Sequence, residues 1–424
     1  MDTFPIKRKK PCRSSTPKNS STPKNSSQMV FLPEELLTKI LPFFNVKTIV
    51  RMKCLSKSWM TFISDSNFVE KHLKNSSKNP HLTMYWHQRN RHLNVVPYSV
   101  SRILKNPCIN LYDSKNFQHS KHHLENPRQF IGSCNGLLCF LLPSETLAVT
   151  DELCFWNPAT RTTSKKLGSS LCYSNWPDLG FFHFTFGYDA SMRTYKVVAF
   201  RASETGGSWK SEVKVFSVGD SCWRNIQSFP MVPFNWLDIP YRRLNDGVHF
   251  NGTVNWLTLD ESITHVEKFG IVSLDLSTET YKQFLLPPGF DDVPFFHPVL
   301  RVLNDSLCFS HDSNKTEFVL WQMKQYGVQE SWNQLFKFSF QNLNVHNIDY
   351  GFPLVCLYVN GDMGIFTDKL RNRAFIYNLK DKTVMSITSI NSIDWSVDKA
   401  MEYVESSMSL FLLIHCFSIL VFMY

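Results

Sequence analysis

The sequence predicts an α+β multidomain protein, in which a small three-helix unit precedes an all-β, propeller-like domain of roughly six blades. Apolar residues at helical spacing predict the helices. From residue 81 the apolar runs become short, with Asn-Gly or Asn-Asp turns between them, which predicts hairpins. The predicted boundaries are 1–30 for a disordered basic arm, 31–75 for the helical unit, 81–405 for the β domain and 408–424 for an apolar tail.

The first thirty residues have the composition of a disordered arm. The hexapeptide Ser15–Ser20 is repeated at once as Ser21–Ser26, and such polar tracts bury too little apolar surface to offset the entropy of ordering. Lys7–Lys10 is either a nuclear import signal or a solvated basic tail, and we favour the tail. Residues 1–28 carry +6 of the formal net charge of +9. We therefore expect no specific nucleic-acid partner for the folded part.

The helical unit begins at a proline-marked helix start. Pro33 suits a first helical turn, and the two glutamates that follow it favour the positive end of the helix dipole. Four apolar residues then share one face: Leu36, Leu37, Ile40 and Leu41. Pro42 ends or bends this helix. Asn45 is a candidate cap for a second helix, Lys47–Lys53.

A third helix begins at Ser56 or Ser58, and its apolar pattern continues until Asn75. Three helices of this length make only a small core. A short unit with surplus apolar surface usually completes its burial against a partner. We therefore expect the helical unit to be a docking element.

This stretch resembles the F-box of plant F-box proteins. The matching segments are Leu32-Pro33-Glu34-Glu35-Leu36-Leu37, Val46-Lys47 and Cys54–Trp59, while Phe43 and Phe44-Asn45 depart from the usual wording. The resemblance implies binding to a Skp-type adaptor and, through it, to a cullin. The implied adaptor contacts are Leu32, Pro33, Leu36, Ile40, Leu41, Val46, Ile49 and Trp59. The alternative is that some of them, Trp59 and Leu36 above all, are internal core.

One turn pattern recurs along the β region. Its asparagines stand at positions 135, 251, 304 and 360, so two gaps are near 55 residues and the first gap is about twice as long. A repeat of this length made of hairpins is typical of a β-propeller, in which ring closure protects the strand edges. Residues 81–405 hold about six such units. The alternative is an unclosed β-sandwich. Residues 132–138 and 187–189 also resemble the F-box-associated, kelch-like domain of the same plant family.

Two groups of residues imitate chemical sites. Gly132–Gly136 looks like a nucleophile elbow around Cys134, but an elbow needs a helix after it, and residues 137–142 read as a strand. We predict a hairpin turn there. The other group could be metal ligands and consists of His119, His122, His123 and Glu125. These residues lie in a polar segment, so we favour a solvated loop over a metal site. We expect no catalytic residue, no metal and no cofactor.

Cysteines and the last residues bear on the compartment. Eleven scattered cysteines without a Cys-x-x-Cys pair predict reduced thiols in the cytoplasm and/or nucleus. Residues 408–424 hold no charged side chain, with the possible exception of His415, and have the minimum length for a membrane-spanning helix. A tail anchor and an extra strand are alternatives, and an appended tail is the favoured explanation. A membrane is a partner only if this tail is an anchor.

The resemblance to plant F-box proteins implies that the chain is the substrate-recognition subunit of a Skp-cullin-F-box type ubiquitin ligase. The helical unit would dock the adaptor, the propeller would bind a target protein that the sequence does not identify, and catalysis would belong to the partner ligase. One alternative is a propeller enzyme resembling galactose oxidase, which needs a metal cluster at the central channel. The other is a nuclear nucleic-acid binder that acts through the basic arm.

Overall fold

The computed structural model describes most of the chain between residues 32 and 407. The described ranges are 3–4, 32–87, 93–109, 129–143, 151–168, 182–205, 208–233, 247–259, 269–288, 290, 298–343, 354–368, 373–389 and 400–407. Most of the predicted arm, the polar segment with His119 to Glu125 and the apolar tail lie outside these ranges. The predictions about them therefore stay predictions.

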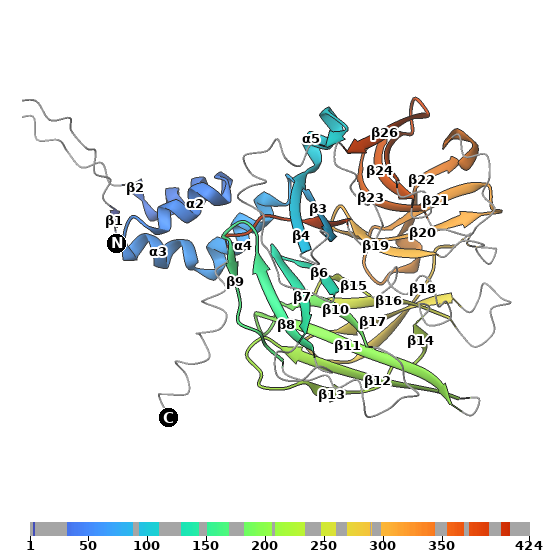
Figure 1. The fold of residues 1–424 in the computed structure, drawn as a ribbon, viewed down its shortest axis with the longest axis horizontal. Helices are drawn as coiled ribbons and strands as arrows, with labels where there is room; N and C mark the ends of the chain where they lie inside the picture. The colour runs from blue at the N-terminus through green and yellow to red at the C-terminus, as the bar shows by residue number, and fades with distance from the viewer. Residues whose placement is uncertain are drawn as a thin grey trace, which may run out of the picture.

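After two short strands near the start of the chain, most of the helices precede most of the strands (Figure 1). The helical elements are α1 (Glu34–Ile40), the 3-10 turn η1 (Leu41–Phe43), α2 (Val46–Lys53), α3 (Lys57–Ser64) and α4 (Ser66–Ser76). The Asn45 side chain caps α2, as predicted, by accepting a hydrogen bond from the Thr48 N–H at 2.9 Å. The sequence predicted one third helix that continues to Asn75, whereas the structure has two helices there, α3 and α4. Asp65 divides them, because its carboxylate accepts hydrogen bonds from the Asn67 and Phe68 N–H groups.

A small core of its own holds the four helices together. Its members are Leu37, Leu41, Ile49, Trp59, Phe62, Ile63 and Phe68, all buried, with Met52 packed against them. The side chains come from α1, η1, α2, α3 and α4. The helices therefore form a distinct packing unit beside the β domain.

Among the described residues, five sheets of four or five strands form the blades of a propeller. The first is β6 (Gln129–Cys134), β7 (Leu137–Pro143), β8 (Asp151–Asn157) and β9 (Thr162–Thr163). The second is β10 (His183–Asp189), β11 (Thr194–Thr205), β12 (Ser208–Ser217) and β13 (Arg224–Ile226). The third joins β14 (Val232–Pro233), β15 (Val248–Phe250), β16 (Thr253–Leu259), β17 (Phe269–Asp275) and β18 (Tyr281–Leu285).

The remaining two blades follow the same antiparallel plan. The fourth is β19 (Val299–Leu303), β20 (Ser306–Ser313), β21 (Glu317–Met323) and β22 (Trp332–Ser339). The fifth is β23 (Leu354–Asn360), β24 (Met363–Asp368), β25 (Arg373–Asn378) and β26 (Thr383–Ser389), with β5 (Cys108–Ile109) added in parallel. Short elements complete the described list: β1 (Thr3–Phe4), β2 (Leu32–Pro33), α5 (Val100–Lys105), η6 (Gln329–Ser331) and η7 (Phe340–Leu343).

A smaller, three-stranded sheet joins the two ends of the β domain. It consists of β27 (Ala400–Tyr403), β3 (His81–His87) and β4 (Leu93–Ser99), in that order. Its strand β27 contacts β6 on one side and β23 on the other, so the innermost strands make a closed ring. Ring closure leaves no exposed inner edge and overturns the alternative of an open sandwich.

The prediction of roughly six blades is wrong, because the described residues form five. The estimate of six came from dividing the length of 81–405 by the hairpin repeat. Part of that length belongs to the three-stranded sheet, which is built from both ends of the β domain rather than from one repeat. Residue length alone does not distinguish such a closing sheet from a blade.

The recurrent turns are confirmed as hairpin turns. Asn135–Gly136, Asn251–Gly252 and Asn304–Asp305 each have positive φ at both positions, as a two-residue turn between twisted strands requires. The fourth turn lies one residue later, at Gly361–Asp362, since Asn360 is still the last residue of β23. A register shift between Cys356 and Tyr358 accompanies this difference.

Candidate partner-docking surface

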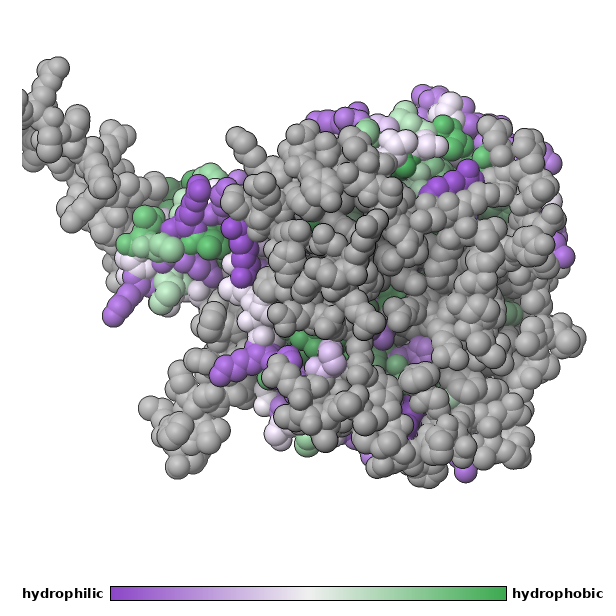
Figure 2. All heavy atoms as spheres, viewed as in Figure 1, coloured by the Kyte–Doolittle hydropathy of each residue, from purple (hydrophilic) through white to green (hydrophobic). Residues whose placement is uncertain are grey.

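Six large apolar side chains on the N-terminal helices and the turns between them are exposed to solvent. They are Leu36 (43% exposed), Ile40 (49%), Phe43 (72%), Phe44 (41%), Leu55 (66%) and Met60 (52%). We call this set the docking face. Figure 2 shows hydrophobic side chains gathered over these helices, with hydrophilic ones beside them. Large apolar groups that gather on one small unit usually mark an interaction site.

The helix period explains how α1 contributes to the docking face. Leu37 and Leu41 stand four residues apart and are buried in the helical core. Leu36 and Ile40 have the same spacing one position earlier, and they are exposed. The four residues that the sequence placed on one apolar face therefore divide into an inward pair and an outward pair.

The eight predicted adaptor contacts fall into two groups. Pro33, Leu36 and Ile40 are exposed. The buried members are Leu41 (4%), Val46 (2%), Ile49 (0%) and Trp59 (6%), and the side chain of Leu32 lies outside the described part. A buried side chain offers little surface to a partner. The internal-core alternative thus holds for Trp59 and is wrong for Leu36, while contact of any of the eight with an adaptor stays a prediction.

Sequence reasoning missed four members of the docking face. In the sequence, Phe43 and Phe44 stand out only as departures from the usual F-box wording, and Leu55 only as part of a matching run, while Met60 belongs to no predicted contact. The sequence does contain a signal for them: when the helical period is used to assign apolar residues to the core, these four are not assigned to it. Solvent exposure of leftover apolar residues points to a partner.

The same helices also expose charged side chains. On α1, α2 and α3 four of these are basic, namely Lys39, Lys47, Arg51 and Lys57, while Glu34 and Glu35 start α1. A partner surface that fits would be apolar at its centre and would carry acidic groups around it, because charge complementarity speeds association and fixes orientation.

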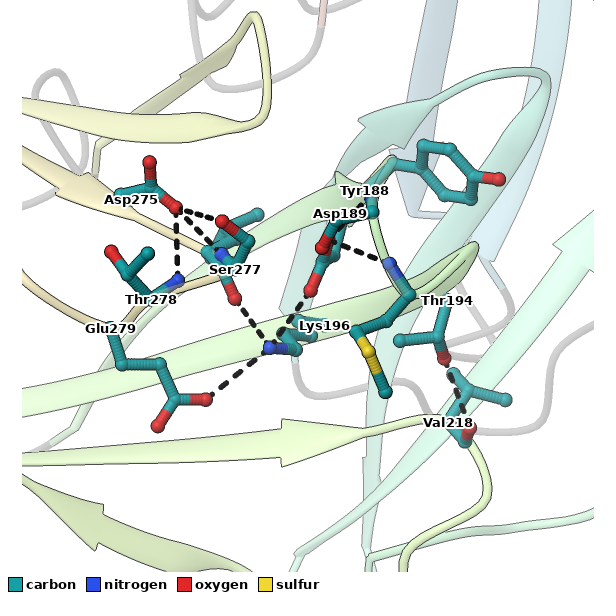
Figure 3. A network of polar contacts seen from close by, with 12 residues as sticks. Tyr188, Asp189, Thr194, Lys196, Val218, Asp275, Ser277, Thr278 and Glu279 are labelled. Atoms are coloured by element: carbon teal, nitrogen blue, oxygen red, sulfur yellow. Dashed lines mark hydrogen bonds and ion pairs between the residues drawn. The ribbon is translucent and has the colours of Figure 1, made fainter.

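A buried ammonium group joins the second and third blades in the β domain (Figure 3). Lys196 on β11 lies 3.1 Å from an oxygen of Asp189 and 3.3 Å from an oxygen of Glu279, and it donates to the Leu276 carbonyl. Glu279 also accepts two hydrogen bonds from Arg224, at 2.7 and 2.9 Å. The network is fully consistent with a structural role, since its charges are paired within it.

The carboxylates of this network are held in their charged form. Burial alone would raise the pKa of Asp189, but hydrogen bonds from Ser191, Met192 and Lys196 outweigh it, and the pKa is lowered. The Arg224 hydrogen bonds lower the pKa of Glu279. A general acid would need the opposite shift.

Cys134 is the sequence position that most resembles a nucleophile, and its surroundings do not activate it. It ends β6, a tight turn follows, and β7 begins at Leu137, so the predicted hairpin is confirmed. His249 Nδ1 lies 3.5 Å from the Cys134 sulfur. Burial raises the pKa of Cys134 and lowers that of His249 to about 4. A catalytic thiolate–imidazolium pair needs both shifts in the other direction.

Neither metal ligands nor a membrane helix were found in the part of the chain that the structure describes. No three His, Cys, Asp or Glu side chains gather there in a way that could hold a metal ion. No helix there is both long and apolar enough to cross a bilayer.

Comparison with known families accounts for both parts of the chain. The F-box domain matches residues 31–71, and the F-box associated beta propeller domain matches residues 89–410. The chain belongs to the F-box proteins that carry this propeller domain. The docking face lies entirely within the F-box match. The strand β3 falls between the two matches and pairs with β27, which lies near the end of the second.

Similar proteins include two from Arabidopsis thaliana. The F-box/kelch-repeat protein At3g23880 is 29% identical over 317 residues, which cover 72% of this chain and 78% of that protein. The F-box protein CPR1 is 27% identical, over 77% of each chain. Among solved structures, a nidogen/laminin complex aligns with a TM-score of 0.38 at 11% identity, covering 78% of this chain and all of that one. That score is too low to support any argument about this F-box protein.

Proposed function

We propose that this F-box protein is the substrate-recognition subunit of a Skp-cullin-F-box type ubiquitin ligase. The F-box docks a Skp-type adaptor, the adaptor links it to a cullin, and the propeller holds a target protein. The role is non-catalytic: a target held near the conjugating enzyme reacts at a higher effective concentration. We further propose that the protein acts in the cytoplasm and/or the nucleus.

The docking face is the observation that carries this proposal. Its six apolar side chains are between 41% and 72% exposed, on a unit with its own core. Burying them against a partner would remove apolar surface from water at about 25 cal/mol per Å². The family match to the F-box supports an adaptor as that partner.

The test is to replace apolar side chains of the docking face by glutamate. The double variant Ile40→Glu, Phe43→Glu should weaken adaptor binding by roughly 100-fold or more, because both side chains would enter the interface as charges. Leu41 should be left intact, since it is buried in the F-box core and its loss would unfold the helices. Binding is measured by titration calorimetry on the full chain.

A matched control lies on the propeller. Leu285 and Met385 are exposed to a similar degree, at 60% and 53%, and belong to β18 and β26. The double variant Leu285→Glu, Met385→Glu should bind the adaptor like the wild type. Equal adaptor affinity of the docking-face variant and the wild type would contradict the proposed function.

A further inference from the structure

The last described residues of the chain pass between the propeller and the F-box. β27 runs antiparallel to β3, and Tyr403 lies opposite His81, close to where the chain enters the propeller from α4. The four residues 404–407 continue from there. Ser406 and Ser407 have no exposed surface. In Figure 1 this segment, in red, runs from the ring toward the helices.

Side chains from both domains hold this segment. Asn157, at the end of β8, donates a hydrogen bond to the Ser406 carbonyl at 3.1 Å. Lys53, at the end of α2, donates one to the Ser407 carbonyl at 3.0 Å. The two successive carbonyls thus bind one group from the propeller and one from the F-box. Burial lowers the pKa of Lys53, as expected for an ammonium group enclosed between packed elements.

The turn between β6 and β7 is shaped to let the segment pass. Gly136 has φ +80°, and a Cβ atom placed there would overlap the Cβ of Ser406 and lie 2.8 Å from the Val404 oxygen. Gly252 occupies the same position in the Asn251–Gly252 turn, with φ +74°, and a Cβ there would meet nothing within 4 Å. The tight approach is therefore a property of this segment and not of the hairpin type.

A second contact lies at another edge of the F-box. Arg193, in the turn between β10 and β11, donates a hydrogen bond to the Ser66 hydroxyl at 2.9 Å. This contact involves exposed groups and should be weak by itself. The short connection 77–80 adds a covalent link. Of the described contacts, the buried one at residues 404–407 is best placed to prevent rotation about that connection.

We propose that residues 404–407 form a strap that fixes the F-box in one orientation against the propeller. The orientation itself is independent of any partner. Its consequence, that a target on the propeller faces the adaptor in a set direction, rests on the function proposed above. The strap would thereby couple the two binding surfaces mechanically.

The test measures the distance distribution between a label at Glu70 on α4 and one at Lys282 on β18, both exposed. Labels are attached through genetically encoded non-natural residues, and distances are read by double electron–electron resonance. Gly136→Ala should displace the strap and broaden the distribution by roughly twofold or more. Gly252→Ala, which introduces the same backbone strain without a collision, should leave it unchanged.

Two further variants keep the proposal testable if Gly136→Ala folds poorly. Lys53→Met removes the donor but keeps the apolar stem, and a chain ending at Tyr403 lacks the strap but keeps β27. Both should broaden the distribution. Adaptor affinity is measured in parallel. If the wild type does not bind the adaptor, the proposed function is overturned but the strap is not. Unchanged distributions in folded strap variants would overturn the strap.

Discussion

At the residue scale, the charged interior of the propeller shows what a single sequence hides. Lys196 lies within the strand-like run Thr194–Phe200 and is 5% exposed. Its partners Asp189 and Glu279 stand 7 and 83 residues away. Asp189 belongs to the same hairpin as Lys196, but no local pattern predicts the pairing with Glu279, because it depends on two blades being neighbours. The F-box shows the same limit on a smaller scale, since helical spacing placed Leu36 and Leu37 on one apolar face and only the structure separates the exposed Leu36 from the buried Leu37.

Removing the buried ammonium should destabilise the propeller. Lys196→Met leaves the Asp189 carboxylate buried without its cation, and we expect a loss of about 3 kcal/mol in the free energy of unfolding. The matched variant is Arg224→Met, because Arg224 binds the same Glu279 but its side chain is 45% exposed. We expect under about 1 kcal/mol for that change. Denaturant unfolding followed by tryptophan fluorescence measures both, and equal losses would contradict this account.

Acidification should destabilise the protein through its buried histidines. His249 has its pKa lowered by burial to about 4, against about 6.5 in an unfolded chain. Between these values the unfolded chain binds more protons, so stability falls as pH falls. From pH 7 to pH 5 the expected loss from His249 is about 2 kcal/mol. Burial also lowers the pKa of His72, His81 and His311, which adds in the same direction.

A variant isolates the part that His249 plays. His249→Gln keeps a polar side chain near the Tyr188 backbone but cannot titrate. Its free energy of unfolding should fall less than that of the wild type between pH 7 and pH 5. Identical pH dependence of the two proteins would show that His249 is not the titrating group.

At the element scale, turn chemistry was more predictable than helix boundaries. Asn-Gly and Asn-Asp pairs located three hairpins correctly, because positive φ at both turn positions strongly favours those residues. The fourth was displaced by one residue, and a register shift in β23 has no sequence signature of its own. The break between α3 and α4 was missed, because the apolar period continues across Asp65 and hides the cap.

Asp65 should contribute to the stability of α4. Its carboxylate accepts hydrogen bonds from the N–H groups of Asn67 and Phe68, at 2.9 and 3.2 Å. Asp65→Ala should cost about 1 kcal/mol. Asp65→Asn keeps the accepting oxygen and should recover most of that loss. Thermal unfolding of the three chains decides the matter, and an unaffected alanine variant would contradict the capping role.

At the scale of the whole molecule, the order of domains was predictable and the way they join was not. Composition and period separate helices from strands, and the hairpin repeat predicts a ring. The sheet that closes the ring combines residues 81–87 and 93–99 with residues 400–403, so it depends on contacts between distant parts of the chain. The same applies to Lys53 and Ser407, which are 354 positions apart.

Because the closing sheet combines the first and last strands of the β domain, the ring cannot close until β27 has been synthesised. β3 is translated some 320 residues before its partner β27, which at ribosomal rates is an interval of roughly 15 to 65 s. Throughout this interval the residues of the docking face are already synthesised, while the strand that closes the ring is not. If that face recruits an adaptor, a prematurely terminated product would sequester it without capturing a target. Messages cut short within the propeller would then encode dominant competitors of the intact receptor.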